Sequence, residues 1–180
     1  MASRLVTAML VAGLFAVSEY GQAIEEYKVK AAFLYNFAKF VEWPSQTFVT
    51  STDPITVCVL GHNPFGNALE EVIHGKSIDG RSFEYRQVSD AESAGACQNL
   101  FVASSEGKHF RAIHGNLKAL GILTVGEAQG FTADGGVINF KLDDGRVRFE
   151  INIDAAEHEQ LRISSKLLSL AQIVKSEKSR

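Results

Sequence analysis

Short apolar runs alternate with amphipathic segments through the middle of this chain, and this alternation restricts the fold more than any other feature. The amphipathic segments carry apolar residues at helical spacing, from Phe65 to Ile73 and from Phe110 to Leu120. Strands that alternate with helices form a parallel sheet with right-handed crossovers. The sequence therefore predicts an α/β fold with a mainly parallel sheet, whose strands are expected at residues 55–60, 82–88, 99–103 and 122–125.

The pattern changes near the C-terminal end, where Asp144-Gly145 separates two segments of alternating polarity. The segments occupy residues 137–142 and 147–153, and a two-residue Asp-Gly loop between them is a strong signal for an antiparallel hairpin. A final helix is expected over residues 165–174. The short loop fixes a register that places apolar residues opposite one another: Leu142 and Val147, Phe140 and Phe149, Ile138 and Ile151.

An aromatic-rich helix is predicted ahead of the first strand, over residues 24–41, and Pro44 is expected to end it near Glu42 or Trp43. Six aromatic residues lie between Tyr27 and Trp43 and cover most of the helix circumference. Either half of them are core residues and the rest have no partner, or some form a contact surface for another protein. On the second interpretation, the candidate contact residues are Phe37, Phe40, Glu42 and Trp43.

The polar face of the hairpin is a second candidate contact surface. Arg148 and Glu150 are two residues apart on one strand, so they share this face and can form an ion pair. Lys141 is expected opposite Arg148, which is unfavourable unless Glu150 or a carboxylate of a partner compensates. Either water covers this face, or Lys141, Arg148 and Glu150 contact a partner or a ligand.

Residues 1–23 have the pattern of a secretory signal peptide. Arg4 precedes an apolar run of thirteen residues, which is short for a membrane span, and small residues precede a cleavage point before Ile24. An uncleaved anchor is the alternative. We therefore expect residues 24–180 to form a single exported α/β domain.

The chain contains two cysteines, Cys58 and Cys97. In an oxidising compartment, an even pair is a candidate for a disulfide, and the alternative is two separate buried thiols on neighbouring strands. A bridge would close a loop of about forty residues, for which the chain-entropy model gives a stabilisation of about 4 kcal/mol.

The turns that follow the first and third strands favour helix starts over catalytic or nucleotide-binding loops. Residues 61–66 match neither the dinucleotide fingerprint nor the P-loop, whereas Asn63 and Pro64 fit an N-cap and a first helical position. Ser104 and Ser105 lack a Gly-x-Ser-x-Gly elbow and fit a helix cap. The sequence therefore predicts a protein that is not an enzyme.

The net charge and the spacing of the histidines argue against nucleic-acid-binding proteins and metalloproteins. The formal net charge of −3 gives no basis for nucleic-acid binding. His109 and His114 are five residues apart, so they do not share a helix face, and no carboxylate completes a metal-ligand set. We expect neither a metal nor a cofactor.

Four blocks of the sequence resemble the YfiR-like periplasmic family. They are YKVKAAFLYNFAKFVEWP from Tyr27, ITVCVLGHNPFG from Ile55, GGVINFKLDDGRVRFEINID from Gly135 and LRISSKLLSLAQIV from Leu161. The resemblance implies a Rossmann-like three-layer α/β sandwich. It also implies a periplasmic repressor that binds the periplasmic domain of a membrane diguanylate cyclase and so controls cyclic di-GMP and biofilm formation. An outer-membrane lipoprotein that relieves the repression, and a homodimer, are further implied partners.

The resemblance also bears on the cysteines, because Cys58 and Cys97 match the family's disulfide pair in position. The founding member has a second pair near the hairpin, where this chain has Thr132 and Asn139, so redox switching through a second bridge is in doubt here. The alternative function is a periplasmic small-ligand-binding sensor or transport accessory protein, suggested by the turn at residues 61–66 and the polar hairpin face.

Overall fold

The computed structural model describes residues 22–117 and 121–175. The predicted signal peptide, apart from residues 22 and 23, and Leu120 of the predicted third helix lie outside this part. In chain order the elements are an N-terminal helix (residues 22–39), β1 (Val41–Glu42), η1 (Ser45–Thr47), β2 (Ile55–Leu60), α2 (Ala68–Ile73), β3 (Ser77–Ile78), β4 (Arg81–Val88), α3 (Ala91–Ala94), β5 (Asn99–Val102), η2 (Ser104–Glu106), α4 (Phe110–Leu117), β6 (Leu123–Gly126), β7 (Ile138–Asp143), β8 (Arg146–Asn152), α5 (Ile153–His158), β9 (Arg162–Ile163), α6 (Ser165–Leu168) and β10 (Gln172–Val174).

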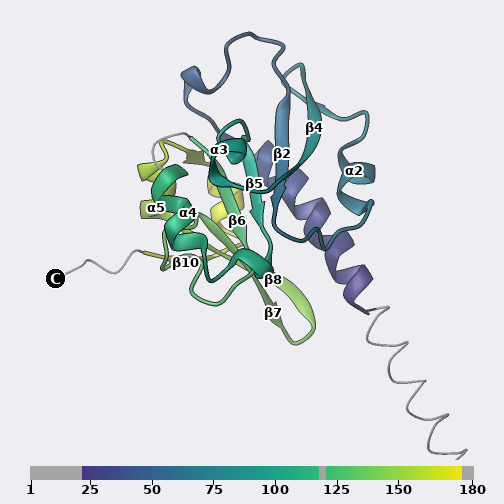
Figure 1. Cartoon of the computed structure of the whole chain (residues 1–180), viewed down its shortest axis with the longest axis vertical. Coiled ribbons are helices and arrows are strands. Elements are labelled where there is room, and N and C mark those ends of the chain that lie inside the picture. The colour runs from purple at the N-terminus through teal and green to yellow at the C-terminus, as the bar shows by residue number, and fades with distance from the viewer. Residues whose placement is uncertain (1–21, 118–120, 176–180) are drawn as a thin grey trace, which may run out of the picture.

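The centre of the fold is an eight-stranded sheet with the order β10-β8-β7-β6-β5-β2-β4-β3 (Figure 1). Neighbouring strands from β4 across to β7 are parallel, and β10 is parallel to β8. The pairs β7–β8 and β3–β4 are antiparallel, and a separate two-stranded sheet pairs β1 with β9. The predicted α/β fold with a mainly parallel sheet is confirmed.

Side-chain alternation along the central strands divides the core between the two faces of the sheet. On β2, Val57 and Val59 join one hydrophobic cluster, whereas Cys58 and Leu60 join the other. The first cluster contains apolar residues of the N-terminal helix, α2, α5 and α6, and the second contains those of α3 and α4. The sheet is thus the middle of three layers, as the family resemblance implies.

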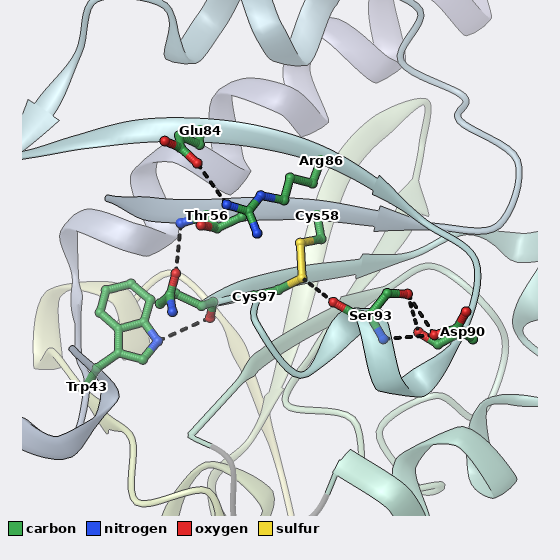
Figure 2. Close-up of a disulfide and its surroundings, with 9 residues drawn as sticks. Trp43, Thr56, Cys58, Glu84, Arg86, Asp90, Ser93 and Cys97 are labelled. Atoms are coloured by element: carbon green, nitrogen blue, oxygen red, sulfur yellow. Dashed lines mark hydrogen bonds and ion pairs between the residues drawn. A yellow bond between two sulfur atoms is a disulfide. The ribbon is translucent and has the colours of Figure 1, made fainter. Parts of the chain in front are cut away.

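The predicted disulfide is present and joins β2 to the segment that leads into the neighbouring parallel strand β5 (Figure 2). Cys58 lies on β2, and Cys97 lies two residues before β5, with a Cα–Cα distance of 5.9 Å. Both side chains are buried in the cluster beneath α3 and α4. The bond therefore fastens the first strand of the sheet to the strand beside it.

The hairpin prediction is confirmed, including its register. Leu142 is paired with Val147, Phe140 with Phe149 and Ile138 with Ile151. The apolar face packs on the N-terminal helix, where Phe37 lies 5.6 Å from Phe140 and 5.0 Å from Phe149 between ring centroids. Local sequence was sufficient here because the loop length and the apolar alternation select the same register.

The predicted final helix over residues 165–174 is wrong in most of its length. Helix α6 ends at Leu168, and the chain then forms β10, which pairs with Glu150–Asn152 of β8. Leu170, in the middle of the predicted helix, is exposed. Residues 172–174 include two β-branched side chains, and a parallel ladder at the open edge of β8 satisfies their backbone groups.

Two helix boundaries also differ from expectation. Helix α2 begins at Ala68, because the Asn63 side chain accepts a hydrogen bond from the Phe65 N–H (2.8 Å) in a turn that precedes the helix. The N-terminal helix ends at residue 39, because Val41–Glu42 pairs with β9 instead of continuing the helix. In both places a local competitor takes the backbone groups that the helix would use.

Candidate functional site

The aromatic residues of the N-terminal helix contact several elements rather than one sheet face. The Phe33 ring lies 5.4 Å from Phe149 of the hairpin, and the Tyr35 ring lies 5.4 Å from Phe83 of β4. Phe37 has an exposed fraction of 0%. Its assignment as a contact residue is therefore corrected, since the hairpin and the helix enclose it in the core. Phe40 and Trp43 are partly buried and lie at the end of the helix.

A pocket of about 480 Å³ lies beside that end of the helix, and we call it the aromatic pocket. The Trp43 indole N–H donates to the Gln98 carbonyl (3.1 Å), which fixes the ring beside Phe48. The Glu42 carboxylate is 3.7 Å from the Arg162 guanidinium and is mostly exposed. The residues that define the pocket are Phe40, Glu42, Trp43, Phe48, Arg81 and Arg162.

A second pocket, of about 520 Å³, lies near the start of the N-terminal helix, and we call it the edge pocket. Ser104 lies two residues after the end of β5, and Glu127 directly follows β6, so both stand at the carboxyl ends of parallel strands. Ligands of open α/β sheets bind at this edge. The residues that define the pocket are Tyr27, Lys30, Glu127, Asn139, Lys141 and Glu150.

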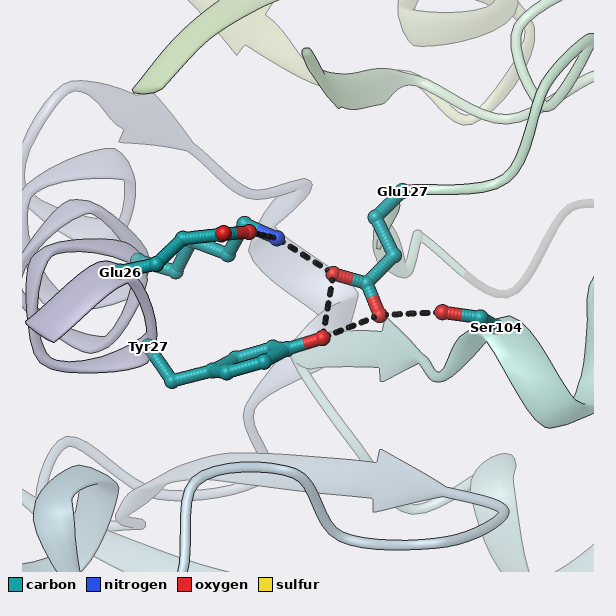
Figure 3. Close-up of polar contacts among 5 residues, drawn as sticks. Glu26, Tyr27, Ser104 and Glu127 are labelled. Atoms are coloured by element: carbon teal, nitrogen blue, oxygen red, sulfur yellow. Dashed lines mark hydrogen bonds and ion pairs between the residues drawn. The ribbon is translucent and has the colours of Figure 1, made fainter. Parts of the chain in front are cut away.

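A buried ion pair joins the helix to the sheet in the edge pocket (Figure 3). The Lys30 ammonium lies 2.6 Å from the Glu127 carboxylate, and their side chains are 5% and 7% exposed. Lys30 also pairs with Glu26, one turn earlier on the helix. A buried lysine is tolerated only with such compensation, because an unpaired ion in the interior has a high desolvation cost.

Two hydroxyl groups complete the surroundings of the Glu127 carboxylate. The Tyr27 hydroxyl donates to it at 3.0 and 3.2 Å, and the Ser104 hydroxyl donates at 2.6 Å. Burial and the adjacent Glu127 charge raise the pKa of the Tyr27 phenol, which therefore stays protonated as a donor. Ser104 makes no helix-cap bond, so its predicted capping role is wrong.

The polar face of the hairpin forms the other wall of the edge pocket. Glu150 pairs with Lys141 across the strands rather than with Arg148, and it accepts a hydrogen bond from the Thr132 hydroxyl (2.7 Å). Burial alone would raise the pKa of Glu150, but hydrogen bonds from Lys141, Thr132 and Asn139 outweigh it and hold this pKa below the usual range. Arg148 lines a neighbouring pocket instead.

The expectation of a water-covered hairpin face is wrong for its inner half. Asn139, Glu150 and Asn152 are 2%, 5% and 1% exposed. The segment between β6 and β7 covers them, as the Thr132 carbonyl accepts a hydrogen bond from the Asn152 amide (2.9 Å). The outer half, with Lys141 and Arg148, is exposed.

Comparison with known proteins identifies the family. The YfiR/HmsC-like family model matches residues 27–172 of the chain. The chain belongs to the YfiR/HmsC-like family. None of the curated proteins matches it.

A solved structure shares the fold of this YfiR/HmsC-like protein at low sequence identity. A conserved domain protein from Vibrio cholerae O1 biovar El Tor strain N16961 is 10% identical, with a TM-score of 0.50 over 68% of this chain and 55% of that chain. An ABC domain in complex with L-Trp from Streptococcus pneumonia is 12% identical, with a TM-score of 0.49 over 66% of this chain and 55% of that chain. The chain thus spans about half the length of these structures.

Sequence reasoning missed the central pair of the edge pocket in this YfiR/HmsC-like chain. Lys30 lies between Tyr27 and Ala31 on the predicted apolar stripe, and a charged residue on such a stripe is a signal for a buried partner. Its partner Glu127 is 97 residues away in the sequence, so no local pattern could name it.

The chemistry that the edge pocket can perform is the binding of polar and charged groups. Among residues 22–117 and 121–175, no group of three or more His, Cys, Asp or Glu side chains could hold a metal ion. In the same part of the chain, no helix is both long enough and apolar enough to cross a membrane.

Proposed function

We propose that this protein is a periplasmic regulator that binds and inhibits the periplasmic domain of an inner-membrane diguanylate cyclase, and so controls cyclic di-GMP and biofilm formation. The observation that carries the proposal is the family match over residues 27–172, because YfiR/HmsC-like membership implies a periplasmic regulator of diguanylate cyclase signalling rather than an enzyme. A cleaved signal peptide over residues 1–23 would deliver the chain to that compartment.

The aromatic pocket is the contact surface that we favour for the cyclase. Partly buried aromatic residues make strong anchors at protein interfaces, and Phe40 and Trp43 are held in place at the rim of this pocket. Basic side chains outnumber acidic ones among its lining residues, namely Lys39, Arg81, Arg162 and Lys166 against Glu42 and Asp79. An acidic segment of the cyclase domain would complement this charge.

The first experiment asks whether the regulation exists. A deletion strain should contain more cyclic di-GMP and attach more strongly, and the tagged protein should capture a membrane diguanylate cyclase. Unchanged cyclic di-GMP and attachment, together with no captured cyclase, would refute the proposal.

The second experiment asks whether the aromatic pocket is the contact surface. Arg162→Glu and Phe40→Ser should weaken cyclase capture, with Arg86→Glu as a matched charge reversal on an exposed strand outside the pocket. Far-UV circular dichroism establishes that each variant is folded. Equal capture by all three variants would place the interface elsewhere.

Processing and assembly belong to the same proposal. Cleavage before Ile24 would leave residues 24–180 as one domain, and the mass of the periplasmic protein tests this directly. We also propose a homodimer and sequestration by an outer-membrane lipoprotein. Light scattering of the purified protein measures the first, and capture from outer-membrane extracts measures the second.

A second candidate function is a periplasmic small-ligand-binding sensor. The specific observation in its favour is that the hairpin residues Lys141 and Glu150 line a pocket together with residues of the N-terminal helix.

A further inference from the structure

A groove of about 520 Å³ opens between the first turns of the N-terminal helix and the tip of the hairpin β7–β8, which lie toward the same end of the molecule (Figure 1). We call it the helix–hairpin groove, and the residues that define it are Glu25, Glu26, Val29, Leu142, Arg146 and Arg148. From its apolar centre and its two oppositely charged sides, we propose that this groove is the interface between two copies of the chain, related by a two-fold axis. The inference rests on the homodimer proposed above, to which neither the family match nor the cyclase contact assigns a surface.

The groove exists because the contact between the helix and the hairpin ends before either element does. The Phe33 ring closes this contact, 5.4 Å from the ring of Phe149. One turn earlier on the helix, Val29 lines the groove together with Leu142, the last apolar residue before the hairpin loop. Their exposed fractions are 43% and 57%. Two large apolar side chains in one groove therefore remain in water, and such a surface is typical of a protein–protein interface.

The hairpin side of the groove carries positive charge without a counterion. Arg146 and Arg148 are exposed and lie two residues apart on β8, so they share one face of the strand. The arginines that form ion pairs within residues 22–117 and 121–175 are Arg86, Arg111 and Arg162. Both guanidinium groups of the groove are therefore available to carboxylates of another molecule.

The helix side of the groove carries matching negative charge. Glu25 is 70% exposed and pairs with Lys28, whereas Glu26 is 20% exposed and pairs with Lys30. An exposed pair such as Glu25–Lys28 contributes little, so this carboxylate can take another partner at small cost. Cleavage before Ile24 would leave both carboxylates in the first turn of the helix, where the helix dipole favours negative charge.

Opposite charges on the two sides of one apolar centre make the groove complementary to itself. A two-fold axis through this centre brings Val29 and Leu142 of the two copies together and sets Glu25 of each copy against Arg148 of the other. Such isologous contacts are the commonest in homo-oligomers. An amphiphilic small molecule with one charged group would use one side of the groove, whereas a second copy uses both sides.

The proposed interface leaves the aromatic pocket accessible. Val29 and Lys39 line the helix–hairpin groove and the aromatic pocket respectively, and ten residues of helix place them about 15 Å apart. Each copy in the dimer therefore keeps its surface for the cyclase.

The first test measures the dimer dissociation constant of the purified mature protein by sedimentation equilibrium at low ionic strength. Glu25→Arg and Arg148→Glu should each weaken dimerisation by about tenfold or more, because each places like charges together in both halves of the interface. The matched controls Glu84→Arg and Arg86→Glu reverse one charge of an exposed pair on β4 and should leave the constant unchanged. Circular dichroism establishes that each variant is folded.

The apolar centre is tested by a second pair of substitutions. Leu142→Glu should also weaken dimerisation by about tenfold or more, because it introduces a charge at the centre of the interface. Val49→Glu is the matched control at an exposed apolar residue outside the groove, and it should leave the constant unchanged. Equal effects of these two substitutions would overturn the assignment.

Mixing the two charge-reversed variants tests the two-fold geometry itself. In a mixed dimer of Glu25→Arg with Arg148→Glu, each half of the interface again has one carboxylate against one guanidinium. We therefore expect the mixed dimer to form more tightly than either variant alone, by about tenfold. Native mass spectrometry identifies it by its mass, and no preference for the mixed dimer would overturn the proposed geometry.

The outcomes separate this inference from the proposals on which it rests. A dimer that all groove variants form as tightly as the unchanged protein would place the interface elsewhere and leave the homodimer standing. A monomer at every concentration would overturn both. Cyclic di-GMP in the deletion strain measures regulation of the cyclase, and that result is independent of the dimer interface.

Discussion

A single residue, Lys30, connects the N-terminal helix to the carboxyl edge of the sheet. Its ammonium group is buried on an otherwise apolar stripe and depends on Glu127 and Glu26 for compensation. A lysine here is a weak choice for stability, since an apolar residue would avoid desolvation. The presence of Lys30 makes a polar pocket possible at a position where an uninterrupted apolar stripe would pack into the hydrophobic core.

Lys30→Met should lower the free energy of unfolding by about 3 kcal/mol, because it leaves the buried Glu127 carboxylate without its cation. Urea denaturation at neutral pH measures this. Lys28→Met is the control on the same helix: Lys28 pairs with Glu25 at the surface, where solvent screens the pair, so its loss should leave the stability nearly unchanged. Similar losses in the two variants would contradict the importance of the buried pair.

Glu150 should make stability depend on pH in the acid range. Its pKa in the folded protein lies below the usual value of 4.5, so the unfolded chain binds the proton first as the pH falls. The stabilisation by Glu150 is therefore fully present above about pH 5 and is lost as the pH falls through 4.5 towards the folded pKa.

The variant Glu150→Gln isolates this contribution. It should be less stable by about 2 kcal/mol at pH 7, and its stability should fall less between pH 5 and 3 than that of the unchanged protein. Urea denaturation across this pH range measures both effects. Glu84→Gln, at an exposed ion pair, should keep the original slope, and a Glu150→Gln variant with that same slope would show the assignment to be wrong.

At the scale of elements, local pattern was reliable where neighbouring residues in the sequence are also partners in the fold. The hairpin β7–β8 follows from its two-residue loop, and β2 and β5 follow from short apolar runs. The C-terminal segment shows the limit. The apolar residues Leu167, Leu170, Ala171 and Val174 have helical spacing, yet residues 172–174 form β10 because the edge of β8 offers a ladder there.

The disulfide is an element-scale constraint, since it fastens β2 to the start of β5. Its two cysteines are 39 residues apart, for which the chain-entropy model gives about 4 kcal/mol. The double variant Cys58→Ala/Cys97→Ala should lose roughly that free energy of unfolding. Addition of a reductant should destabilise the unchanged protein similarly and leave the double variant unaffected; a reductant effect on both would point to another cause.

At the scale of the whole molecule, the N-terminal helix separates the two pockets. Lys30 and Lys39 line the edge pocket and the aromatic pocket respectively, and nine residues of helix place them about 14 Å apart. Partner binding at one end and ligand binding at the other would then use different side chains of one rigid element.

This separation predicts additive energetics. The losses of unfolding free energy from Lys30→Met and Trp43→Ala should add within about 0.5 kcal/mol in the double variant, because the sites share no contact. Lys30→Met combined with Glu127→Leu should deviate from additivity by more than about 1 kcal/mol, because these side chains form the buried pair. Coupling of the first pair as large as the second would mean that the two pockets are not independent.

The sequence by itself determined the α/β class, the parallel strands, the hairpin register and the disulfide candidates. Periodicity and loop length can be read from short stretches of sequence, and two cysteines allow one pairing. It also directed attention to Lys141 and Glu150, which pair with each other, but not to the hydrogen bond that the Thr132 hydroxyl donates to Glu150. Only the tertiary structure placed Phe37 in the core, turned residues 172–174 into a strand and brought Lys30, Glu127 and Asn139 into one pocket. The reason is that a side chain's burial and charge partners depend on segments such as 27–30 and 127, which are close in space and 97 or more residues apart along the chain.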